Sequence, residues 1–106
     1  PSRVFLDTSW SILIKNNGRK MLPILGRYLT ERKVNIKRWE EPLFHPRLPL
    51  GMINGILDPI SGKATADRFE EKVPKGKTYK LDLGHYPHVE DPKAVLEAFK
   101  SFHATL

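Results

Sequence analysis

Apolar residues recur at helical spacing in the first half of the chain. Residues 5–14 predict one helix, and Asn16-Asn17-Gly18 predicts its end. Residues 21–29 carry a second apolar stripe, with Pro23 in the first turn of the predicted helix, where its missing N–H costs nothing. A short amphipathic segment follows over residues 34–39. The first half is therefore predicted to be helical.

The second half alternates between strand and helix patterns. Residues 48–55 form a short apolar run that predicts a buried strand, and residues 78–83 alternate as a second strand. Helices are predicted over residues 64–73 and from Pro92 onward. The last helix has its apolar face at Val95, Leu96, Phe99 and Phe102. This order predicts parallel strands covered by helices.

Three prolines mark the connection between the halves, namely Pro42, Pro46 and Pro49. We therefore predict a helical segment over residues 1–47 and a βαβα unit over residues 48–106. The predicted fold class is α/β, with two parallel strands and flanking helices. Two parallel strands do not form a stable sheet alone, because both faces and both edges need cover. We expect either self-association or a larger α/β domain of which this is the end.

Composition narrows the class of protein. The 106 residues are 40% hydrophobic and 28% charged, as in ordinary globular domains. The absence of cysteine excludes a disulfide framework, a thiolate zinc site and a cysteine nucleophile. No apolar run approaches the roughly 18 residues of a membrane helix, and residues 1–5 do not begin a signal peptide. We predict a cytoplasmic protein without a membrane partner.

The net charge of +6 comes mostly from residues 15–38, where eight basic residues face the single acid Glu31. Such a segment is suited to a nucleic acid or another anionic surface. The interpretation we favour is the solvated face of helices, because few aromatic residues interleave with the charges. A nucleic-acid partner would reveal itself by an affinity that falls steeply with salt.

Two residues with catalytic chemistry follow the predicted strands. Asp58 comes shortly after the first strand and His85 directly after the second. The carboxyl ends of neighbouring parallel strands meet at one edge of a sheet, so both side chains are expected there. An imidazole with a carboxylate at its far nitrogen is a general base of defined tautomer. Taken singly, an Asp before a proline is usually a turn residue and a lone His is usually structural.

The remaining histidines predict no further site. His88 and Glu90 lie close to His85, but a third metal ligand is missing. His45 and His103 are interpreted as exposed polar residues. We predict neither a metal nor another cofactor.

The amino-acid sequences of the two loops resemble those of a known family. Asn54-Gly55-Ile56-Leu57-Asp58-Pro59-Ile60-Ser61-Gly62 and Gly84-His85-Tyr86-Pro87-His88-Val89-Glu90-Asp91-Pro92 are similar to the acid and histidine loops of α/β-hydrolases. The nearest resemblance is to the epoxide-hydrolase, haloalkane-dehalogenase and mesoderm-specific-transcript branch. It is specific over residues 48–106 and weaker over residues 18–47, which resemble the end of a helical cap.

The resemblance implies roles for individual residues. Asp58 would be the triad acid and His85 the general base, while Glu90 and Pro92 would shape the loop and start the last helix. Tyr28 and Trp39, on the cap-like segment, would line the pocket for a small, apolar substrate. Each of these two aromatic residues is also consistent with plain core packing.

One part of the family pattern is absent from these residues. A hydrolase nucleophile is a Ser or Asp flanked by glycines on a tight turn after a strand. The five serines lack this context, and Ser61 is interpreted as a helix N-cap or turn residue. We therefore expect the C-terminal portion of a hydrolase, inactive alone and completed by an N-terminal half that bears the nucleophile. The alternatives are a non-catalytic interaction module and, third, a basic nucleic-acid binder.

Overall fold

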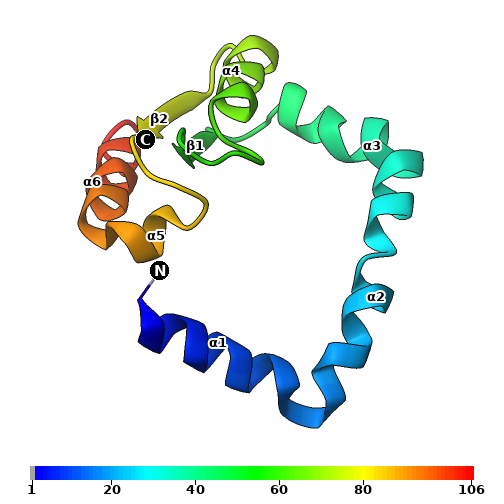
Figure 1. Cartoon of the computed structure of the whole chain (residues 1–106). Helices are drawn as coiled ribbons and strands as arrows, with labels where there is room; N and C mark the ends of the chain where they lie inside the picture. The colour runs from blue at the N-terminus through cyan, green and yellow to red at the C-terminus, as the bar shows by residue number, and fades with distance from the viewer. Residues whose placement is uncertain (1) are drawn as a thin grey trace. The chain divides into compact units, whose positions relative to one another are not determined.

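The computed structural model describes residues 2–106 and divides the chain into two compact units, residues 1–39 and 40–106. Figure 1 gives the order of the elements along the chain. No helix in the described range is both long enough and apolar enough to cross a membrane. The predicted boundary between residues 47 and 48 stays a prediction, and the two units are described separately.

The first unit is helical. It contains α1 (Arg3–Ile14), the 3-10 helix η1 (Lys15–Met21), α2 (Leu22–Leu25) and most of α3 (Tyr28–Phe44). Ser2 caps α1 by accepting a hydrogen bond from the Phe5 amide at 3.2 Å. Asn16 and Asn17 have φ values of 54° and 60°, in the left-handed region that asparagine tolerates best among residues with a side chain. The predicted break after the first helix is confirmed.

Two details of this half differ from prediction. The apolar stripe over residues 21–29 is not one helix, because the chain turns at Gly26-Arg27 between α2 and α3. Pro42, which we assigned to a connector, lies inside α3. Its missing N–H removes one helical hydrogen bond, and the pattern resumes beyond it when His45 N donates to Glu41 O at 3.0 Å. The connector is therefore shorter and starts after Phe44.

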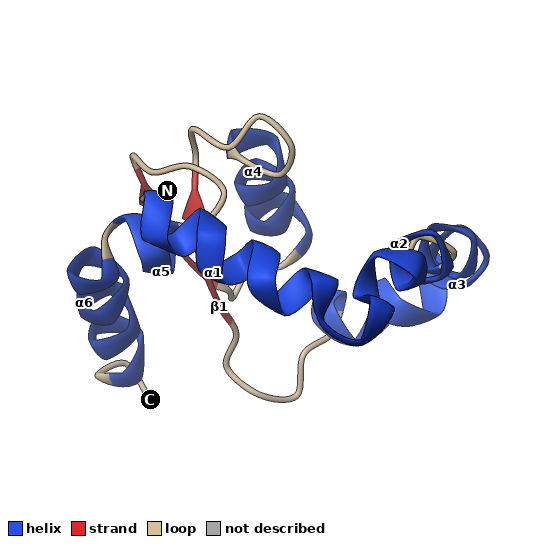
Figure 2. Ribbon diagram, turned by 60° about the horizontal axis from the view of Figure 1, so that its bottom comes forward, coloured by secondary structure: helices blue, strands red, loops and turns tan. Residues whose placement is uncertain are grey.

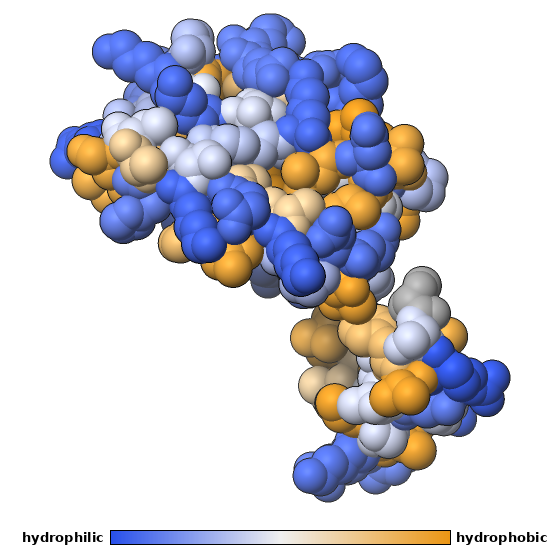
Figure 3. Space-filling view, turned by 90° about the vertical axis from the view of Figure 1, so that its left-hand side faces the viewer, coloured by the Kyte–Doolittle hydropathy of each residue, from blue (hydrophilic) through white to orange (hydrophobic). Residues whose placement is uncertain are grey.

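The first unit has no buried residue among its described positions. Large apolar side chains are mostly solvent-accessible, as at Val34, which is 78% exposed, and Ile12, which is 67% exposed. Figure 3 shows apolar side chains at the surface of one face of the molecule, mixed with hydrophilic ones. Most helical stability in proteins comes from burying an apolar face. These helices therefore receive little of that contribution within their own unit.

The second unit carries the sheet. It contains the end of α3, β1 (Gly51–Gly55), α4 (Lys63–Lys72), β2 (Lys77–Leu81), α5 (Pro87–Glu90) and α6 (Pro92–His103). The strands pair in parallel, with Gly51 opposite Lys77 and Gly55 opposite Leu81. The predicted parallel βαβα order is confirmed. The structure is compatible with an α/β fold.

Helices lie on both faces of this two-stranded sheet (Figure 2). On one face, Lys80 of β2 reaches Asp67 and Glu70 of α4, with Nζ–carboxylate distances of 2.9 Å. The core of this layer is small, with Ala66 0% and Val73 2% exposed. On the other face α6 packs across the strands. The sheet therefore has cover on its faces, as the sequence predicted.

Both strands are shorter than predicted. β1 begins at Gly51, after Pro49, which has no N–H to donate to a ladder, although Leu50 O already accepts from Lys77 N at 2.9 Å. β2 ends at Leu81 because Leu83 N folds back onto Leu81 O at 2.8 Å. The predicted loop over residues 84–92 contains the short helix α5, which starts at a proline.

The predicted apolar face of α6 is only partly buried. Ala98 is buried, whereas Leu96 is 49% and Phe99 56% exposed. Phe99 and Phe102 border a cavity of about 180 Å³ against the sheet, whose other lining residues are Gly51, Ile53 and Tyr79. Two strands are too narrow to cover the full width of this helix face. The remaining apolar side chains consequently reach the surface.

Candidate active site

The loop after β1 places Asp58 at the carboxyl edge of the sheet. Ile56 N donates to Leu81 O at 2.9 Å, and Leu57 N donates to Leu83 O at 3.0 Å, so the loop stays beside the chain that leaves β2. Asp58 N then donates to Gly55 O at 3.2 Å, which turns the chain. The acid therefore follows one strand while facing the end of the next.

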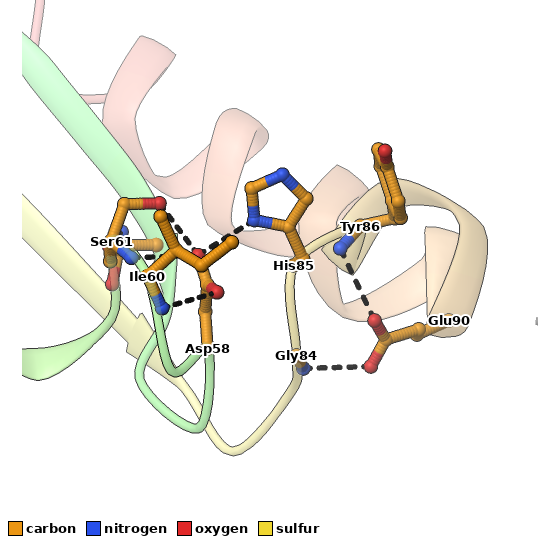
Figure 4. A network of polar contacts seen from close by, with 8 residues as sticks. Asp58, Ile60, Ser61, Gly84, His85, Tyr86 and Glu90 are labelled. Carbon is orange, nitrogen blue, oxygen red and sulfur yellow. Dashed lines mark hydrogen bonds and ion pairs between the residues drawn. The ribbon is translucent and has the colours of Figure 1, made fainter.

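Four hydrogen bonds hold the Asp58 carboxylate (Figure 4). Oδ1 accepts from Ile60 N at 2.9 Å. Oδ2 accepts from Ser61 N at 3.1 Å and from Ser61 Oγ at 2.5 Å. The fourth donor is His85 Nδ1, 2.8 Å from Oδ2. The Asp58 side chain is only 4% exposed, so these donors replace the water that would otherwise solvate its charge.

His85 presents one ring nitrogen to the acid and leaves the other free for chemistry. Nδ1 donates to Asp58 Oδ2, an ionised carboxylate that can only accept, so the neutral ring carries its proton on Nδ1. Nε2 lies on the opposite side of the ring, away from Asp58 (Figure 4). The His85 side chain is 46% exposed, and the Tyr86 ring meets it edge-on at a centroid distance of 4.8 Å. This arrangement suits a base that accepts a proton at Nε2.

Glu90 organises the backbone on both sides of His85. Its Oε2 accepts from Gly84 N at 2.7 Å and its Oε1 from Tyr86 N at 3.1 Å. These two bonds hold the pKa of the Glu90 carboxyl below its ordinary value, because they favour the charged form. α6 begins at Pro92 directly behind this loop. The structure agrees with the implied loop-shaping roles of Glu90 and Pro92.

Replacement of Glu90 by Gln is expected to loosen the His85 loop. The two backbone N–H groups meet different Glu90 oxygens, and glutamine replaces one of these oxygens by a nitrogen that only donates, so one N–H group loses its acceptor. We expect hydrogen exchange at the Gly84 and Tyr86 amides to become about tenfold faster, as NMR can measure. Glu97→Gln is the matched control, since Glu97 is exposed and pairs with exposed Lys100. Equal exchange rates in the two variants would contradict this role of Glu90.

Acid is expected to destabilise the site. The Ser61 hydroxyl, the Ile60 amide and His85 hold the pKa of Asp58 well below its usual range, and that of Glu90 is also lowered. The unfolded chain therefore binds protons more readily than the folded chain, from about pH 5 downward. The stabilisation is fully present above that range and is lost as pH falls through the lower folded-state pKa values.

Denaturant unfolding between pH 7 and pH 2, followed by circular dichroism, measures this loss. Asp58→Asn removes one titrating group, so its stability should be lower at pH 7 and should depend less steeply on pH. A folded state that gains stability on acidification would contradict the expected sign.

The other predicted residues have less informative surroundings. Tyr28 and Trp39 lie on α3 within the first unit, 55% and 42% exposed. Their role in substrate binding stays a prediction. His88 belongs to α5 and contacts the Tyr86 ring edge-on, while His103 ends α6 beside Phe99. Within residues 2–106, no group of three His, Cys, Asp or Glu side chains is arranged to hold a metal.

Sequence reasoning missed the contribution of Ser61. The cap of α4 is Gly62, with no side-chain hydrogen bond, so Ser61 is not the N-cap residue but lies in the turn before it, the other role predicted for it. Its hydroxyl donates to Asp58 instead, and its carbonyl accepts from Asn54 Nδ2 at 2.8 Å. The Asp-x-x-Ser spacing is typical of a side-chain-closed turn and was the available signal. Asn54, a polar residue within an apolar strand, was a second one.

Comparison with known proteins finds relatives that include a protein named as a hydrolase. No family profile and no solved structure matches the chain. Over 93 residues, or 87% of the chain, it is 36% identical to the Mycobacterium tuberculosis protein "Putative hydrolase LipZ", of which 32% is covered. It is 30% identical to the mesoderm-specific transcript protein of Mus musculus and to its Homo sapiens homolog over 105 residues, or 96% of the chain.

The matches cover 31% of each mesoderm-specific transcript protein, so the chain spans about a third of the length of these relatives. They support a hydrolase-like relationship without selecting a branch of that family.

Proposed function

We propose that these residues supply the acid and the general base of a hydrolase triad, with Asp58 as the acid and His85 as the base. The observation that carries the proposal is the 2.8 Å contact between Asp58 Oδ2 and His85 Nδ1, with Nε2 on the opposite side of the ring. The contact joins two loops that follow neighbouring parallel strands. Its support from outside the structure is the relationship to a protein named as a hydrolase.

The proposed chemistry needs a nucleophile from outside these 106 residues. With a serine nucleophile, Nε2 would take the hydroxyl proton as Oγ attacks the substrate, and would later return it to the leaving group. With an aspartate nucleophile, Nε2 would activate the water that hydrolyses the covalent intermediate. In both cases the Asp58 charge stabilises the imidazolium. Ser61 does not fit the nucleophile's role, because its hydroxyl donates to the triad acid.

We further propose the substrate class. The bond cleaved would be an ester, an epoxide or a related bond in a small, apolar molecule, as in the epoxide-hydrolase and dehalogenase-like branch. Tyr28 and Trp39 would belong to the cap over the substrate. Both side chains are about half exposed, so each has apolar ring surface available for a ligand.

A chimera tests the proposal directly. This chain would replace the matched 93-residue segment of the Mycobacterium tuberculosis relative, after that relative has been shown to hydrolyse p-nitrophenyl esters or a simple epoxide. We expect the chimera to retain turnover and the 106-residue chain alone to show none. Turnover of a generic ester by the chain alone, abolished by His85→Ala, would contradict the need for an external nucleophile. A folded chimera without turnover would contradict the triad.

A second candidate function is a non-catalytic interaction module. The exposed apolar side chains of the first unit favour it, since such surfaces commonly meet another protein. In that case the partner, or a second copy of the chain, would cover these side chains and the open edges of the sheet. Sedimentation of the purified chain would show self-association, and the chimera would fold without hydrolysing any substrate.

A further inference from the structure

The two oxygens of the Asp58 carboxylate accept different numbers of hydrogen bonds. Among the residues that the structure describes, Oδ1 accepts one hydrogen bond, from Ile60 N. Oδ2 accepts three, from Ser61 N, Ser61 Oγ and His85 Nδ1. A carboxylate oxygen offers about two lone pairs, so three donors at Oδ2 compete for its charge. The hydroxyl has the shortest contact of the three, at 2.5 Å against 2.8 Å for the imidazole.

Ser61 is held in this position from the sheet. Asn54, in β1, donates from Nδ2 to Ser61 O at 2.8 Å. Within the described residues, the buried Oδ1 of the same amide has no hydrogen-bond partner, so the amide is oriented by Ser61. The following residue, Gly62, is buried and begins the turn into α4. The backbone that carries the hydroxyl is therefore held against β1.

We propose that Ser61 is a positioning residue. By donating to Asp58 Oδ2, its hydroxyl weakens the interaction between the carboxylate charge and the His85 ring. The inference rests on the proposed function, in which His85 is the base, and it adds a third side chain, that of Ser61, to the acid–base pair. An O–H···O⁻ hydrogen bond is among the stronger ones in proteins, and its donor withdraws charge from the acceptor oxygen. Ser61 and His85 donate to the same oxygen, so strengthening one bond weakens the other.

Removal of the hydroxyl makes His85 a stronger base. In Ser61→Ala, Oδ2 keeps the backbone donor and the imidazole but loses its strongest competitor. The negative charge on Oδ2 then interacts more strongly with the ring and favours its protonated form, because an adjacent carboxylate stabilises imidazolium. We expect the midpoint of the His85 ring titration to rise by about half a pH unit. In the active chimera, the acidic limb of the pH dependence of kcat/KM should move upward with it.

NMR on the full, isotope-labelled chain measures this midpoint from the ring Cε1–H signal. Four variants define the result: Ser61→Ala, Ser61→Cys, Ser61→Thr and Ser101→Ala. A thiol is a weak donor of similar shape, so Ser61→Cys should move the midpoint in the same direction as Ser61→Ala. Ser61→Thr retains a hydroxyl and should stay near the wild-type value. Ser101 lies exposed on α6, so its replacement is the matched control.

The outcomes separate the two proposals. A midpoint that is unchanged or lower in both Ser61→Ala and Ser61→Cys would overturn the role of Ser61. If Ser61→Ala does not fold, as amide dispersion would show, Ser61→Cys alone decides. An inactive but folded chimera whose Ser61 variants still show the upward shift would remove the hydrolase proposal and leave the Ser61 inference standing. Asp58→Asn should lower the midpoint, which verifies that the signal reports this contact.

Discussion

His85→Ala in the hydrolase chimera is expected to lower kcat/KM by about 10⁴-fold with little change in KM. The variant removes the nitrogen that would accept the proton of the nucleophile or the water, and with it the contact to Asp58 Oδ2. Steady-state kinetics with a chromogenic ester, at several pH values, measures the loss.

The histidine control separates chemistry from folding. His103→Ala removes an imidazole from the end of α6, away from the carboxyl edge of the sheet, and should stay within about threefold of the parent chimera. Asp58→Asn should approach the loss of His85→Ala, because an amide no longer stabilises the imidazolium. A His85→Ala chimera with a tenth or more of the parent activity would contradict the proposed base.

Gly55→Val is expected to destabilise the chain by about 3 kcal/mol and to separate Asp58 from His85. A Cβ atom at position 55 would lie 2.1 Å from Gly84 O and 2.6 Å from Leu83 O. Both are backbone atoms of the chain that leads to His85, so they cannot turn aside as a side chain would. Relief of the clash requires this segment to move, and His85 moves with it.

Denaturant unfolding and the His85 NMR signals measure the two effects together. Gly26→Ala is the matched control, because its Cβ would meet nothing closer than 3.5 Å and its φ of −59° suits alanine. That variant should be neutral or more stable by about 0.5 kcal/mol. If Gly55→Val unfolds at the same denaturant concentration as the parent and keeps the His85 signals, the close approach has no structural role.

Much of the fold follows from local patterns. Three elements can each be predicted from their own residues alone. They are the strand with a period of two over residues 78–83, the strand in the apolar run before Asn54 and the helix with helical spacing after Pro92. The parallel pairing follows because a helix separates the strands. These predictions hold where one segment carries enough residues of a single pattern.

Other parts of the fold depend on competition between segments. Pro42 favours the end of a helix, yet α3 continues through it, since cooperative hydrogen bonding on both sides offsets one missing bond. Phe99 belongs to an apolar face that the last helix pattern predicts to be buried. The burial of Phe99 depends on how many strands lie beneath α6. The local sequence pattern of the helix does not predict that number.

The site divides in the same way. The sequence by itself placed Asp58 and His85 at one edge of the sheet, because consecutive parallel strands end on the same side. Only the tertiary structure decided which oxygen meets Nδ1, that Ser61 shares this oxygen, and that Glu90 holds the backbone around the imidazole. Hydrogen bonds weaken within a few tenths of an ångström and with poor alignment. Such distances are set by the packing of loops against each other, as at Gly55, and are not encoded in spacing along the chain.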